Sequence, residues 1–145
     1  MNKQELLQEL DVEFNRWKEE AKFNVTLNEL DNVFFLRDYI LSSNFVSPSI
    51  SRMICARIRD TFWARIQSLH AWLMPSPYSL LDSVEQKAFS DEDKTAMNII
   101  IKEFMSFIHE NGLIGLNKSK EQESKWVDDA LPLWQKHLPT LIKYI

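Results

Sequence analysis

The segment PSISRMICARIRDTFWARIQSLHAWL, residues 48–73, has the pattern of one long helix. Apolar residues nearly encircle it at helical spacing. Its start places Ser47 before Pro48, and proline is favoured at the first helical position because the missing amide is not needed there. Pro75 and Pro77 follow its end, and proline cannot continue a helix. The sequence therefore predicts a long central helix over about residues 48–73.

The segments on either side also have helical patterns. They run from about residues 3 to 22, 26 to 41, 80 to 89, 91 to 111 and 120 to 144. No segment alternates apolar and polar residues between hairpin turns, and the chain has only two glycines. At 145 residues it has the length of one domain. These features predict an all-α domain over residues 1–145, an irregular or orthogonal bundle of five to six helices.

Two helix starts are predicted from capping residues. Thr26 and Glu29 have the spacing of a capping box, in which a side-chain oxygen accepts from an early backbone amide of the helix. Ser90 and Asp93 have the same spacing. We therefore expect one helix to follow Thr26 and another to follow Ser90.

Glycine and proline predict interruptions later in the chain. Asn111-Gly112 suits the left-handed residue that often ends a helix. Pro132 and Pro139 fall in the last helical segment, although its apolar residues keep helical phase across both. We therefore expect a helix end at Gly112, and kinked or consecutive helices after residue 120.

Composition excludes several classes of protein. The net charge is −4, which argues against a uniformly basic nucleic-acid-binding domain. Cys55 is the only cysteine, so the chain forms no intramolecular disulfide and no cysteine zinc cage. No apolar run approaches the length of a membrane span, and residues 1–5 lack an apolar signal segment. We expect a cytoplasmic protein with no membrane partner.

Catalytic and metal-binding motifs are absent from the sequence. His70, His109 and His137 are too far apart to be helical ligand pairs, and there is no His-Glu-x-x-His. Nucleophile-elbow, phosphate-loop and dinucleotide fingerprints are also missing. We therefore expect no catalytic residue, no cofactor and no metal.

Arg65 has an unusual position for a charged residue. It lies three residues after Phe62 and four before Leu69, in the middle of the apolar face of the central segment. Burying an unpaired guanidinium is costly, so Arg65 either meets a carboxylate, extends to the edge of the face or lines a pocket. A helical ligand-binding protein or enzyme, with an anion or ligand contact at Arg65, is therefore one alternative.

A second stripe on the central segment favours binding to protein. Arg52, Arg59, Trp63 and His70 lie together on another side of the helix. Partly exposed aromatic and arginine clusters are typical of protein interfaces. The first interpretation is therefore a non-catalytic protein-interaction or regulatory module. It would dock a protein partner, or a second copy of the chain, through this stripe.

The start of the central segment suggests DNA binding as another alternative. The sequence SISRMI, residues 49–54, resembles the opening of the recognition helix in helix-turn-helix proteins. The resemblance implies a DNA-binding regulator with Ser49, Ser51 and Arg52 facing base edges or phosphates. The preceding turn departs from the family pattern, because Asn44 stands where glycine is usual. Nucleic acid is therefore not the favoured partner.

Overall fold

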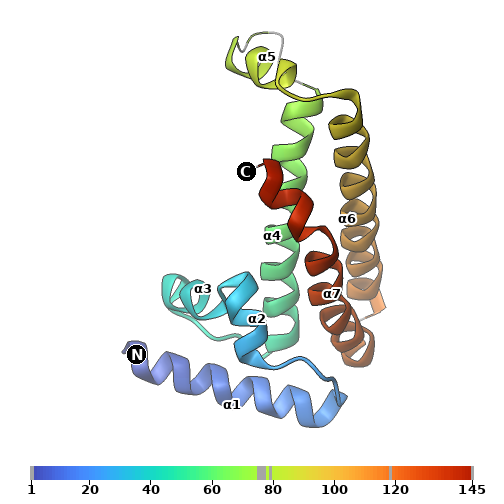
Figure 1. Cartoon of the computed structure of the whole chain (residues 1–145). Helices are drawn as coiled ribbons and strands as arrows, with labels where there is room; N and C mark the ends of the chain where they lie inside the picture. Colours follow the sequence, from blue (N-terminus) through green and yellow to red (C-terminus); the bar gives the residue numbers. More distant parts are fainter. Residues whose placement is uncertain (1, 75–77, 79, 118, 145) are drawn as a thin grey trace.

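A computed structural model describes residues 2–74, 78, 80–117 and 119–144, with only the backbone described at residues 82, 83, 85 and 86. This part of the chain is all-helical, as predicted (Figure 1). None of its helices is long and apolar enough to cross a membrane. In chain order the helices are α1 (Lys3–Ala21), α2 (Leu27–Phe34), α3 (Leu36–Ser43), α4 (Ile50–Leu73), α5 (Leu80–Lys87), α6 (Asp91–Asn117) and α7 (Lys120–Tyr144).

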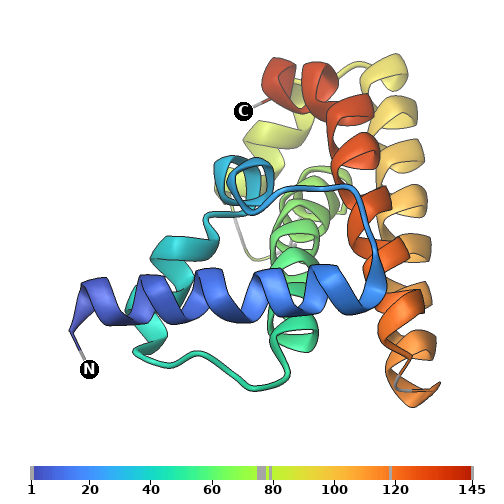
Figure 2. The same cartoon turned by 90° about the horizontal axis from the view of Figure 1, so that it is seen from below.

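The long helix α4 is the centre of the bundle. It packs against α6, α7 and α1, and its C-terminal end contacts α5. Helix α6 runs antiparallel to it, whereas α1, α2 and α3 lie around its N-terminal half (Figure 1). Figure 2 shows α1 crossing the start of α4. The predicted long central helix is therefore confirmed. It runs from the broad lower end of the molecule to its narrower upper end (Figure 1).

The core is built around Phe62 of α4. Its ring lies 4.6 Å from that of Phe104, measured between centroids, at an interplanar angle of 87°. The rings of Phe34, Phe107 and Trp134 also surround it. Edge-to-face aromatic pairs stabilise a core by about 0.5–1.5 kcal/mol beyond the area they bury. Phe62 therefore joins α2, α6 and α7 to the central helix.

Both predicted capping sites are present. The backbone amide of Glu29 donates to the Thr26 hydroxyl over 3.2 Å. The amide of Asp93 donates to the Ser90 hydroxyl over 3.1 Å, and the amide of Ser90 donates to Asp93 Oδ2 over 3.0 Å. These caps fix the starts of α2 and α6 close to the predicted positions.

The segment expected as one helix over residues 26–41 is divided. Phe35 adopts a left-handed backbone, with φ 53° and ψ 50°, and separates α2 from α3. The division lets Phe34 and Leu36 both reach the core. Packing of these neighbours therefore prevails over the usual preference of a bulky residue for negative φ.

The start of α4 also differs from the prediction. The helix begins at Ile50, two residues after Pro48. The Ser47 hydroxyl accepts from the amide of Ser49 over 3.0 Å, so it caps a turn before the helix. The helix ends at Leu73, as predicted, while Pro75 and Pro77 lie outside the described residues.

The predicted stop at Gly112 is wrong. Helix α6 continues through Gly112 and Gly115 to Asn117, and neither glycine has a positive φ. Asn111 and Ile114 are buried on the side that faces the bundle, so packing on both sides of Gly112 holds the helical backbone. Tertiary contacts here override the low helix propensity of glycine.

The last region is one helix with both prolines inside it. Helix α7 includes Pro132 and Pro139, and its ribbon changes direction along its length (Figure 1). Trp126 and Leu141 are buried at its two ends. The indole nitrogen of Trp126 also donates to the Phe107 carbonyl over 2.8 Å. Burial along the helix therefore offsets the hydrogen bonds that the prolines remove.

The uninterrupted helix α6 gives a test. A Cβ atom added at Gly112 or Gly115 meets nothing within 4 Å. Because glycine costs about 0.5–1 kcal/mol relative to alanine inside a helix, Gly112→Ala and Gly115→Ala should each raise the free energy of unfolding by about that amount. Urea denaturation measures the change. Destabilisation by Gly112→Ala would show that the helix ends there in a left-handed turn.

A carboxylate joins the start of α6 to the end of α7. Asp93 Oδ1 accepts from the Tyr144 hydroxyl over 2.7 Å and from Lys143 Nζ over 3.4 Å. The hydrogen bond from Tyr144, followed by those from Ser90, holds the pKa of Asp93 well below its usual range. Ionised Asp93 therefore holds the C-terminus of α7 against α6.

This contact predicts a dependence on pH. The pKa of Asp93 is lower in the folded than in the unfolded chain, so its contribution to stability is full above the unfolded value of about 3.9 and is lost as the pH falls below it. Asp93→Asn should lower stability at neutral pH and reduce the further loss in acid. Urea unfolding at neutral and acid pH measures both. Asp91→Asn, in the same helical turn, is the control, and equal acid sensitivity of wild type and Asp93→Asn would contradict the assignment.

Candidate functional site

The predicted partner-binding stripe lies along one open flank of α4. The Arg52 side chain is 48% exposed and Trp63 is 43% exposed, and His70 is also exposed. Arg59 differs, because it is half-buried and its guanidinium donates to Asn111 Oδ1 over 3.0 Å. The structure therefore leaves three of the four stripe residues accessible and uses the fourth to fasten α4 to α6.

A matching row on α6 lies beside this stripe. It consists of residues spaced alternately four and three apart, which share one side of a helix. The row is Ile101, Met105, Ile108, Gly112 and Gly115. The two glycines border the same hollow as Arg52 and Arg59, which places the row on the flank of α6 next to α4. The two helices pack directly against each other, and we call their adjoining flanks, together with the hollow at the glycine end, the α4–α6 groove.

The lower end of the groove opens into a hollow of about 230 Å³. Its walls are formed by Arg52, Cys55, Arg59, Asn111, Gly112, Gly115 and Glu123. The space exists because neither glycine has a side chain and nothing lies within 4 Å of where a Cβ would stand. The hollow is large enough to take one inserted side chain.

Cys55 lines this hollow but is not suited to chemistry. The thiol is buried, and burial followed by the nearby Glu123 carboxylate raises its pKa to about 12. The nucleophilic form of cysteine is the thiolate, which is scarce when the pKa is so high. Cys55 is therefore an unreactive structural thiol near neutral pH.

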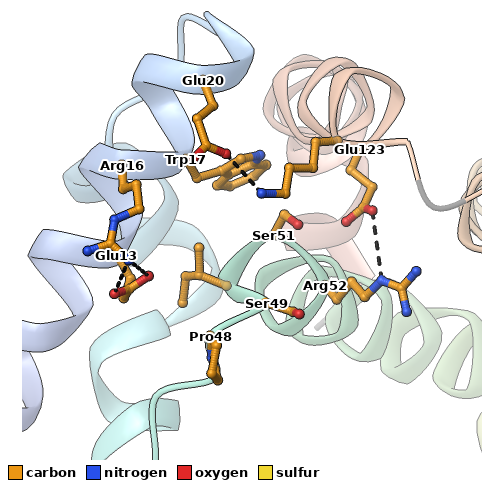
Figure 3. A pocket seen from close by; sticks show the side chains of 11 residues that line it. Glu13, Arg16, Trp17, Glu20, Pro48, Ser49, Ser51, Arg52 and Glu123 are labelled. Carbon is orange, nitrogen blue, oxygen red and sulfur yellow. Dashed lines mark hydrogen bonds and ion pairs between the residues drawn. The ribbon is translucent and has the colours of Figure 1, made fainter.

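A second and larger pocket lies where α1, the start of α4 and the start of α7 meet (Figure 3). Its volume is about 550 Å³. It is lined by Glu13, Arg16, Trp17, Glu20, Pro48, Ser49, Ile50, Ser51, Arg52, Lys120 and Glu123. We call it the junction pocket.

Two ion pairs at the junction pocket are complete. Arg16 donates to Glu13 over 3.0 Å within α1. Lys120 donates to Glu20 over 2.9 Å and so connects α7 with α1. The Lys120 and Glu20 side chains are both well exposed, and such surface pairs contribute about 0–1 kcal/mol. These pairs shape the rim of the pocket more than they stabilise the fold.

Glu123 is the unusual acid of the junction pocket. Its side chain is only 5% exposed, and its nearest cation is Arg52, with Nε 3.9 Å from Oε1. The other oxygen, Oε2, is buried and has no hydrogen-bond partner among the described residues. The first turn of α7 favours a negative charge, which offsets part of the cost of burial. Even so, this carboxylate is poorly satisfied by the protein itself.

Trp17 contributes a second unsatisfied polar atom to the same pocket. The ring is buried and packs at 4.3 Å from that of Phe23, between centroids. Its Nε1 is buried and also lacks an acceptor within the part of the chain described. In Figure 3 the indole nitrogen points toward α7, and the Glu123 carboxylate points toward the start of α4. Trp17 and Glu123 therefore both line one cavity, and each carries a buried polar atom without a partner among the described residues.

The other sequence-predicted residues lie apart from these pockets. Arg65 is half-buried and makes no hydrogen bond or ion pair with any described residue. Its neighbours on the same helix face, Phe62 and Leu69, are buried, but Arg65 itself is buried only in part. It lines neither the hollow nor the junction pocket. A ligand contact at Arg65 stays a prediction.

The residues of the helix-turn-helix resemblance face inward as well as outward. Ser51 is buried, and Ser49 and Arg52 line the junction pocket beside α1 and α7. Ser51 lines the same pocket, so it faces α1 and α7 rather than the outer surface of α4. The DNA-binding alternative stays a prediction.

The histidines have separate surroundings. His70 and His109 are exposed. His137 is buried and shares a short hydrogen bond with Glu103, whose pKa is lowered chiefly by that bond and by one from Lys136. Across residues 2–74, 78, 80–117 and 119–144, no three histidine, cysteine, aspartate or glutamate side chains form a group fit to hold a metal ion.

Sequence reasoning did not identify Trp17 and Glu123 as site residues. Trp17 continues the apolar stripe of α1 and is indeed buried, so its spacing indicates only core. Glu123 is one of two acids in the first turn of α7. Nothing in the local pattern separates it from its exposed neighbour Glu121. Only the packing of α7 against α4 and α1 distinguishes the two acids.

Comparison with known proteins does not assign the chain to a family. No protein-family model, curated protein or solved structure matches the chain.

The unsatisfied carboxylate predicts a gain of stability on substitution. Because a buried charge without a close partner is costly, Glu123→Gln should raise the free energy of unfolding by about 1 kcal/mol. Chemical denaturation at neutral pH measures it, with the exposed Glu121→Gln as the control. A loss of stability specific to Glu123→Gln would show instead that the carboxylate is held by the protein.

Proposed function

We propose that this protein is a non-catalytic interaction module that docks a helical segment of a partner protein in the α4–α6 groove. The supporting observation is the open flank of α4. There Arg52, Trp63 and His70 stay accessible beside the row of α6. Grooves between packed helices accept amphipathic helices through side chains spaced three, four and seven residues apart.

The groove has the residue types expected of a binding surface. Trp63 is 43% exposed on one side and Met105 is 44% exposed on the other. Tryptophan, methionine and arginine are enriched at protein interfaces, where large apolar groups are buried and guanidinium groups pair with acids. The hollow at Gly112 and Gly115 supplies space for one anchoring side chain.

Charge favours an acidic partner. The hollow is lined by two arginines, Arg52 and Arg59, and by one acid, Glu123. The chain as a whole is acidic, with a net charge of −4, so an excess of base at this hollow is a local feature. An amphipathic helix with one apolar and one acidic side is therefore the best match, because opposite charges also direct its orientation.

A second exposed apolar surface lies at the upper end of the molecule. Leu80, Leu81 and Val84 of α5 are all exposed, as is Met74 after the end of α4. Single exposed apolar residues are ordinary, but four within a short stretch of chain are typical of a contact surface. This second surface favours a partner that is larger than one helix.

Substitutions in the groove test the proposal. Trp63→Glu places a charge where the partner's apolar side would lie, and Gly112→Leu fills the hollow. Both should lower retention of the partner by roughly tenfold or more, since interface tryptophans often contribute 2 kcal/mol or more. Quantitative affinity isolation from cell extract, followed by binding assays with the purified partner, measures the loss.

The controls separate the groove from the rest of the surface. Val12→Glu changes an exposed apolar residue on α1 and should leave retention unchanged. Light scattering on the purified chain distinguishes the occupants. A dimer that Trp63→Glu converts to monomer would make the partner a second copy. Equal retention by wild type and both groove variants would refute the proposal.

A further inference from the structure

We propose that the junction pocket is a second binding site, which shares Arg52 and Glu123 with the hollow of the α4–α6 groove, for a small zwitterionic unit. This unit is an α-ammonium group beside a carbonyl or carboxylate oxygen. Free α-amino acids carry it, and so does the N-terminus of a peptide. The proposal does not depend on the groove, because its ligand enters between α1, the start of α4 and the start of α7.

Glu123 supplies the group that recognises the ammonium. Its carboxylate is buried, carries one oxygen with no partner among the described residues, and reaches Arg52 only at 3.9 Å. An ammonium group is a compact cation with several N–H donors, so it satisfies such a carboxylate through charge-assisted hydrogen bonds. A half-turn of the carboxyl group exchanges its two oxygens, and either one therefore serves.

Trp17 supplies the donor for the adjacent oxygen. Its buried indole N–H has no acceptor within the described residues, and an indole nitrogen only donates. A carbonyl or carboxylate oxygen of the ligand satisfies it. Ile50 and Ser51 border the same pocket at the first turn of α4, where backbone amides lack intrahelical acceptors and negative charge is favoured.

The balance of charge selects a zwitterion. Three acids, Glu13, Glu20 and Glu123, and three bases, Arg16, Arg52 and Lys120, line the pocket. A simple anion would leave Glu123 unsatisfied and would lie against its charge. A simple cation would leave the Trp17 donor unsatisfied and would face the three bases. A ligand that carries both charges at neighbouring atoms pairs with the Glu123 carboxylate and also with the Trp17 donor.

Binding would tie three helices together. Trp17 belongs to α1, Ser51 to α4 and Glu123 to α7, and the Lys120–Glu20 pair already connects two of these helices beside the pocket. A ligand that binds only the folded chain raises the unfolding temperature, by an amount that grows with the logarithm of its free concentration relative to Kd. Thermal stability therefore reports binding without an assumed activity.

The experiment screens proteinogenic amino acids, their α-amides, their N-acetyl derivatives and the matching 2-hydroxy acids at equal millimolar concentration. Thermal unfolding of the full chain is one readout. The other is the Trp17 indole N–H resonance in a nitrogen-15 correlation spectrum, assigned with Trp17→Phe. At least one amino acid or amide should raise the unfolding temperature and shift that resonance, whereas N-acetyl and hydroxy analogues should do neither.

The pattern of binding identifies the source of the unit. Binding of acids but not amides indicates a free amino acid, and equal binding of amides indicates a peptide N-terminus. Glu123→Gln should weaken binding by at least roughly tenfold, because a charge-assisted bond is replaced by a neutral one. Glu121→Gln, outside the pocket, should bind as wild type does.

Three results would overturn the proposal. One is the absence of any shift in unfolding temperature or in the Trp17 resonance with every amino acid and amide. Another is equal binding of N-acetyl derivatives, which lack the ammonium charge. The third is unchanged affinity in Glu123→Gln. None of them bears on retention of a protein partner by the groove, which is measured with Trp63→Glu.

Discussion

The structure depends on covering the apolar circumference of α4. A helix with apolar residues on so many sides cannot be buried by one neighbour, so α6 and α7 pack along it while α1, α2 and α3 surround its N-terminal half. Phe62 is central to this arrangement, because its ring meets aromatic rings from α2, α6 and α7. The cover is incomplete toward the C-terminal half. There Trp63 and His70 stay exposed and Arg65 is only half-buried.

Incomplete ion pairing occurs at the opposite, N-terminal end of α4. Arg52 and Glu123 line both the hollow of the α4–α6 groove and the junction pocket, so one poorly satisfied ion pair separates two cavities. Native proteins rarely leave a buried carboxylate oxygen without a donor, because the cost of desolvation is then not repaid. A protein selected only for stability would place a neutral residue at this position. The same reasoning applies to Gly112 and Gly115, which weaken α6 and leave open space beside α4.

Local sequence patterns predicted the structure correctly where one short-range interaction determines the local backbone conformation. The caps at Thr26 and Ser90 are such cases, because a hydroxyl and an amide a few residues apart determine where a helix starts. They failed where packing opposes propensity. Gly112 stays helical between buried neighbours, and Phe35 takes a left-handed backbone so that residues on both sides reach the core. The energies gained by such burial exceed the roughly 1 kcal/mol differences on which local prediction depends.

The sequence by itself determined the all-α class, the long central helix and the grouping of Arg52, Arg59, Trp63 and His70 on one flank. These properties follow from spacing within one helix, which the chain carries locally. Only the tertiary structure decided that Gly112 and Gly115 lie opposite that flank and that Trp17 and Glu123 border one pocket. The physical reason is that these residues belong to different helices. Their distances depend on how the apolar faces of α1, α6 and α7 pack on α4, and no local pattern records that packing.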